Sequence, residues 1–64
     1  MTKKAVTFTV QIDDQLAQAL AQFIKRVGWS EMRQNAVDDV EAYDMRDGLD
    51  QVRKALQEVG YDPR

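Results

Sequence analysis

Residues 5–12 read AVTFTVQI, and this stretch decides which fold the sequence predicts. Apolar residues take every second position, and threonine or glutamine stands between them. Alternation with a period of two, rich in β-branched and aromatic residues, is typical of a β-strand with one buried face. The sequence therefore predicts a strand whose inward row is Val6, Phe8, Val10 and Ile12.

A single strand leaves its backbone hydrogen bonds unmade, so this segment requires a pairing partner. Nothing else in the 64 residues alternates in the same way. The simplest partner is a second copy of the chain, which gives an antiparallel two-stranded ribbon across a two-fold axis. The alternative is a short edge strand that its own helices cover or that pairs with a few residues of the tail. We expect the first, with Val6, Phe8, Val10 and Ile12 as the dimer contact.

The next residues predict a helix between Asp13 and Gly28. Asp13 is a suitable N-cap, and Gly28 is expected to end the helix in a left-handed conformation. Five apolar residues recur at helical spacing and are expected to form one core-facing stripe: Leu16, Leu20, Phe23, Ile24 and Val27.

Two more helices are predicted in the second half of the chain. Residues 29–37, WSEMRQNAV, indicate a short helix capped by Ser30. A long helix runs from Asp38 to Val59, and Glu41 stands at capping-box distance from Asp38. A break near Asp38 is expected because the apolar stripes of the two segments would lie about 150–180° apart on one continuous helix.

The predicted architecture is a mostly α domain with one N-terminal strand, in the order β-α-α-α, over residues 1–64. The chain has no cysteine and no histidine, so it lacks disulfides, the commonest zinc ligand and the usual general base at neutral pH. It also has no glycine-rich phosphate loop. We therefore expect no enzyme activity, no metal and no cofactor. The absence of a long apolar run or a signal peptide predicts a cytoplasmic protein that does not enter the membrane.

Charge is distributed unevenly along the chain. The net charge is −2, made up of +2 over residues 1–34 and −4 over residues 35–64. The carboxylates gather at the start of the long helix, around Tyr43, which lies off the apolar stripe of that helix. We predict that these residues bind a basic protein partner: Asp38, Asp39, Glu41, Tyr43, Asp44, Asp47 and Asp50. The alternative is a solvated helix face whose first turn favours negative charge.

Residues 5–37, read as strand, helix, glycine and second helix, resemble the ribbon-helix-helix family of DNA-binding proteins. The resemblance implies that the strands of two subunits pair and enter the major groove. It assigns base reading to Thr7, Thr9 and Gln11, and phosphate contacts to Lys3, Lys4 and the N-terminus of the helix that begins at Ser30.

The segments ALAQFIKRVGWSEMRQNAVDDVEAYDMRDGL and VRKALQEVGYDPR look like short uncharacterised proteins of proteobacterial mobile elements. Such elements encode small acidic inhibitors of host defence, including anti-CRISPR proteins, which this chain resembles in size and charge. Two hypotheses follow. The first is a non-enzymatic inhibitor or regulator that presents an acidic helix to a basic or nucleic-acid-binding protein. The second is a dimeric DNA-binding transcriptional regulator or antitoxin of the ribbon-helix-helix type.

Overall fold

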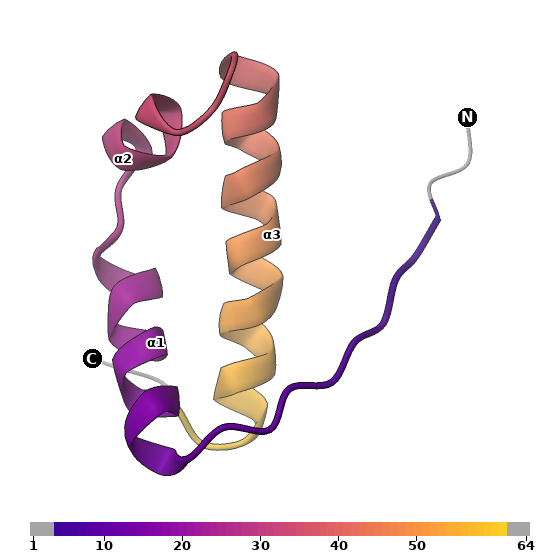
Figure 1. The fold of residues 1–64 in the computed structure, drawn as a ribbon, viewed down its shortest axis with the longest axis vertical. Coiled ribbons are helices and arrows are strands. Elements are labelled where there is room, and N and C mark those ends of the chain that lie inside the picture. Colours follow the sequence, from indigo (N-terminus) through magenta and orange to yellow (C-terminus); the bar gives the residue numbers. More distant parts are fainter. Residues whose placement is uncertain (1–3, 62–64) are drawn as a thin grey trace.

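The structure is a computed structural model that describes residues 4–61, and this range contains three helices (Figure 1). Helix α1 spans Asp14–Arg26, α2 spans Trp29–Gln34 and α3 spans Asp39–Glu58. Helices α1 and α3 lie side by side and run in opposite directions, and α2 lies beside the start of α3. The helical part of the expected order is therefore present, including the break near Asp38.

The predicted strand is wrong. Residues 5–12 are in neither a helix nor a strand, and the structure contains no strand anywhere in residues 4–61. Residues 4–12, called here the N-terminal arm, run away from the helices with their side chains exposed (Figure 1). The β-α-α-α fold and the intersubunit ribbon built on it are therefore withdrawn. The alternating sequence fits a pleated surface, but no second strand is present to accept its hydrogen bonds.

Helix α1 begins as the sequence predicts and ends differently. The carboxylate of Asp13 accepts a hydrogen bond from the backbone N–H of Leu16 at 2.9 Å, which caps the helix. The helix ends at Val27 in an extended conformation, and Gly28 has a φ of −108°, so the expected left-handed stop is absent. Gly28 instead precedes α2, and its N–H donates to the carboxylate of Glu31 at 3.2 Å. Ser30 lies inside α2 and does not cap it.

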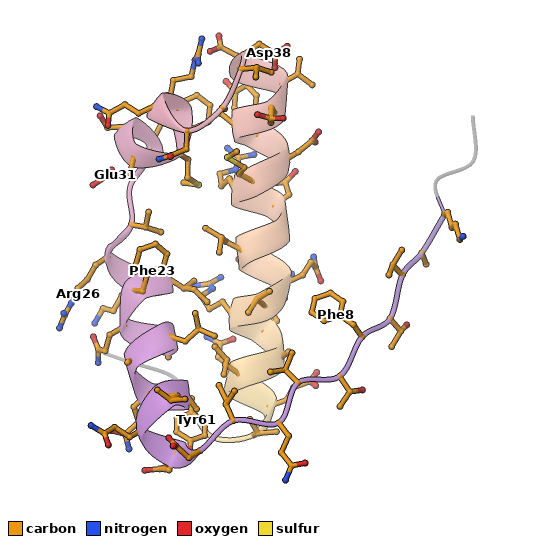
Figure 2. All side chains as sticks on the ribbon, in the orientation of Figure 1. Phe8, Phe23, Arg26, Glu31, Asp38 and Tyr61 are labelled. Carbon is orange, nitrogen blue, oxygen red and sulfur yellow. The ribbon has the colours of Figure 1, made fainter. Side chains whose placement is uncertain are left out.

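Helix α3 is closed at both ends by the residues that the sequence indicated. Asp38 caps it by accepting from the N–H of Glu41 at 2.9 Å, and the Glu41 carboxylate accepts from the N–H of Val37 at 2.9 Å. Gly60 follows the helix with a φ of 101°, a conformation that favours glycine. Tyr61 then donates a hydrogen bond from its hydroxyl to Asp14 at the start of α1 (Figure 2). This bond joins the last described residue to the first turn of the bundle.

The buried core is small and is made mostly of alanine. Within residues 4–61 the buried apolar side chains are those of Ala17, Ala21, Ile24 and Ala42. Apart from Ile24, the larger apolar side chains of residues 4–61 are half-buried or exposed. The expected stripe on α1 is therefore wrong in part, because Leu16, Leu20 and Phe23 remain exposed.

Candidate protein-binding surface

The seven residues predicted to bind a partner lie together at the start of α3. We call Asp38, Asp39, Glu41, Tyr43, Asp44, Asp47 and Asp50 the acidic surface. Asp38 is the N-cap of α3, and the other six belong to the helix itself (Figure 2). Glu41 and Asp50 are half-buried and the others are exposed. The structure thus gathers these side chains within the first turns of one helix, although they point in several directions around its axis.

Several of the carboxylates already have a cation beside them. Arg33 of α2 contacts Asp39 at 2.6 Å, and Arg46 contacts Asp47 at 3.3 Å. The sequence shows only one cation, Arg46, among the residues of the acidic surface. In the structure, α2 and the next turn of α3 also supply cations to it. The negative potential of the surface is therefore weaker than the sequence suggests.

Asp50 is held by two cations from its own helix. Arg53 contacts its carboxylate at 2.6 Å and Lys54 at 3.4 Å. The hydrogen bond from Arg53, followed by that from Lys54, lowers the pKa of Asp50 below 3.8. Asp50 is therefore charged at neutral pH, with two cations beside it.

Asp44 differs from the other carboxylates of the acidic surface. Asp38 and Glu41 accept backbone hydrogen bonds at the start of α3, so their charge also serves the helix. Within residues 4–61, Asp44 has neither a cation nor a hydrogen-bond donor as a partner. It is exposed and lies one turn after Val40 on the same side of α3. Asp44 is thus the carboxylate most available to a basic group from outside.

Apolar side chains accompany these charges. Val40 is 68% exposed and Val37, in the turn before α3, is 82% exposed. The Tyr43 ring lies 4.7 Å from the Trp29 ring, centroid to centroid, at an angle of 40°. The guanidinium of Arg46 lies 5.1 Å from the centroid of the Tyr43 ring, in the range of a cation–π contact. Tyr43 is thus held in place on one side and exposed on the other.

Val37 and Val40 were not among the predicted site residues. One signal for Val40 was present, because its helical position lies away from the stripe formed by Met45 and Leu49. No pattern in the sequence showed that Arg33 would reach across the turn to Asp39. That contact depends on how α2 packs against α3.

The residues assigned to DNA by resemblance are not brought together. Lys4, Thr7, Thr9 and Gln11 are exposed on the N-terminal arm, whereas Ser30 lies in α2, on the opposite side of α3 (Figure 1). Lys3 lies outside the described residues. The ribbon that would present these side chains to a groove is not formed in residues 4–61.

A protein-family model described as a family of unknown function, DUF7706, matches residues 1–64. The chain belongs to this family. No curated protein and no solved structure matches the sequence.

In this family member, residues 4–61 contain no group of three His, Cys, Asp or Glu side chains arranged to hold a metal. Over the same range, no helix is long and apolar enough to cross a membrane.

Proposed function

We propose that this protein is a non-enzymatic inhibitor or regulator that binds a basic, nucleic-acid-binding protein through the acidic surface. The observation that supports this most directly is the position of Asp44, exposed and without a cation, beside the exposed Val40. Interfaces of this kind combine apolar or aromatic anchors with charges that set orientation and association rate. Val40 and Tyr43 supply the anchors, and Asp44 and Asp47 supply the charge.

The existing ion pairs do not prevent such binding. The pair between Arg46 and Asp47 is exposed on both sides, and exposed pairs contribute about 0–1 kcal/mol. An arginine or lysine from a partner can therefore replace Arg46 at small cost. Arg46 also lies 5.1 Å from the centroid of the Tyr43 ring, a contact that does not involve Asp47.

The proposal includes the cellular location and the genetic origin of the protein. We place the protein in the cytoplasm and assign it to a mobile genetic element, where a small inhibitor of a host nucleic-acid-binding protein would act. We do not propose the DNA-reading alternative, because residues 5–12 form no strand and lie across α3 from Ser30.

The test compares two charge reversals on the same helix. Asp44 and Glu58 are both exposed, and neither has an ion pair within residues 4–61, so Asp44→Lys and Glu58→Lys make the same charge change at opposite ends of α3. Each variant and the natural protein are immobilised, incubated with a bacterial lysate freed of nucleic acid, and washed at rising salt. Captured proteins are identified by mass spectrometry.

We expect the natural protein and Glu58→Lys to retain the same basic, nucleic-acid-binding protein. We expect Asp44→Lys to release it at a lower salt concentration in the wash, because a like charge now opposes the partner and weakens binding about tenfold. Equal capture by all three proteins, or capture of acidic proteins only, would contradict the proposal.

A further inference from the structure

Helix α1 carries two neighbouring rows of apolar side chains, and the chain buries the smaller row. The buried row, facing α3, is Ala17, Ala21 and Ile24. The row beside it, called here the outer row, consists of Leu16, Leu20 and Phe23, which are 55%, 38% and 56% exposed. Covering an exposed leucine or phenylalanine is favourable, because it removes apolar area from water. The outer row is therefore a surface that gains considerably from being covered.

The outer row continues into an open groove between the helices. This groove has a volume of 700 Å³, and its apolar lining includes Phe23, Met32, Met45, Leu49 and Val52. Gly48 also lines the groove, and a Cβ atom added there would meet no atom within 4 Å. Three polar residues, Arg26, Glu31 and Asn35, also line the groove, and Figure 2 shows the labelled side chains of Arg26 and Glu31 extending away from α3. The groove is thus open, apolar and without a neighbour at Gly48.

The N-terminal arm has the complementary character. Residues 5–12 carry no charge and place Val6, Phe8, Val10 and Ile12 in alternate positions, with Val6 and Phe8 both 73% exposed. No backbone group of residues 4–12 takes part in a hydrogen bond within the described chain. Figure 2 shows Phe8 on the arm, on the side of α3 away from Phe23. An apolar segment and an apolar groove are therefore exposed on the same molecule without covering each other.

The arm reaches a second copy more easily than its own groove. Asp13 has an extended conformation with φ −74° and ψ 169°. From there the arm crosses past the end of α3 and continues on the side of α3 away from α1 (Figure 1). To cover its own outer row, the arm would have to reverse direction near residues 12–14 from the course drawn in Figure 1. Eight extended residues span about 26 Å at about 3.3 Å per residue, which exceeds the roughly 20 Å length of a 13-residue helix.

The exposed area is of the size that a second copy would cover. The chain has an accessible surface of 5675 Å² for a mass of 7.4 kDa. A folded monomer of this mass exposes about 4,200 Å², so the excess is about 1,500 Å². A stable interface buries about 800 Å² of each partner. The excess surface is thus sufficient for such an interface.

We propose that two copies of this chain associate by exchanging their N-terminal arms. The row of Val6, Phe8 and Val10 from each copy covers the outer row of α1 and the groove of the other copy. The contact is between side chains, and the two arms do not pair with each other as strands. This interface is separate from the acidic surface, so either proposal can fail without the other.

The test is the mass of the protein in solution, measured by light scattering over a range of concentrations. The natural protein should change from one chain to two as concentration rises. Phe8→Asp and Phe23→Asp should each raise the concentration of half-association at least about tenfold, because each places a charge in an apolar contact. Thr9→Asp, on the opposite row of the same arm, is the matched control and should change it less than about threefold.

Circular dichroism of the dilute proteins checks that the variants fold. Phe8 and Phe23 are exposed in the single chain, so the helical signal of the monomers should equal that of the natural protein. A monomer at every concentration would overturn the proposal. A dimer that Phe8→Asp leaves intact would overturn the role of the arm, and one that Phe23→Asp leaves intact would overturn the role of the groove.

Discussion

Leu20 and Ala21 are adjacent in α1, yet the alanine is 3% exposed and the leucine 38%. Ala21 belongs to the buried side of α1 with Ala17 and Ile24, and two of these three side chains are alanines. A buried alanine is sensitive to added volume, whereas the neighbouring row of α1 remains open. Several consequences for stability can be measured on the dilute, single chain.

Enlarging the buried row should destabilise the chain more than trimming the exposed row. Ala21→Leu forces extra volume between α1 and α3 and should lower the free energy of unfolding by about 1–3 kcal/mol. Leu20→Ala removes a partly exposed side chain and should cost less than Ala21→Leu. Urea unfolding followed by circular dichroism measures both values. A larger loss for Leu20→Ala would mean that α1 packs with the other row inward.

The same substitution at two glycines should have opposite effects. Gly48 is helical with open space at its Cβ position, so Gly48→Ala should raise the free energy of unfolding by up to about 1 kcal/mol. Gly60 has a φ of 101°, so Gly60→Ala should lower it by about 1–2 kcal/mol. Thermal unfolding of the two variants beside the natural protein gives the comparison. Destabilisation by Gly48→Ala in the monomer would show that a neighbour already lies against it.

The cap of α3 should contribute measurably to stability. Asp38→Ala removes the carboxylate that accepts from the N–H of Glu41 and should cost about 1 kcal/mol. Asp47→Ala removes the same charge from an exposed ion pair and is expected to change stability by less than about 0.5 kcal/mol. Urea unfolding at neutral pH measures the free energy of unfolding of both variants. Equal losses would argue against a stabilising role of the Asp38 cap.

Alkaline pH should weaken the bond between the two ends of the bundle. The hydrogen bond from the Tyr61 hydroxyl to Asp14 raises the pKa of Tyr61 above 10.0. Because the folded pKa is the higher one, its stabilising contribution is complete below pH 10 and is lost as the pH rises through the folded pKa. Absorbance titration of a Tyr43→Phe variant reports Tyr61 alone. Adding Asp14→Ala should move the midpoint down towards 10.0, and an unchanged midpoint would contradict the contact.

The helices could be predicted from local signals in the sequence. Asp13 and Asp38 act as N-caps, and Gly60 follows α3, because capping depends on side chains close in sequence. Which row of α1 is buried could not be predicted, because helical spacing shows an apolar face but not how closely two helices approach. In the structure Ala17 is buried and Leu16 is 55% exposed.

The strand predicted for residues 5–12 is wrong for a different reason. The alternation of residues 5–12 shows which side chains suit a half-buried surface, but a strand also requires another strand for its hydrogen bonds. At the acidic surface, the sequence located the carboxylates correctly within α3. It did not show that Arg33 neutralises Asp39, since that ion pair spans the turn between two helices.

The exchange of arms between copies is tested most directly by nuclear magnetic resonance on a mixture of isotope-labelled and unlabelled chains at a concentration that favours the dimer. Filtered nuclear Overhauser spectra then detect only contacts between different copies. Contacts are predicted from the Phe8 ring of one copy to the side chains of Phe23, Met45 or Val52 of the other. Contacts of Phe8 only within its own chain, or only with Phe8 of the other copy, would contradict the exchange.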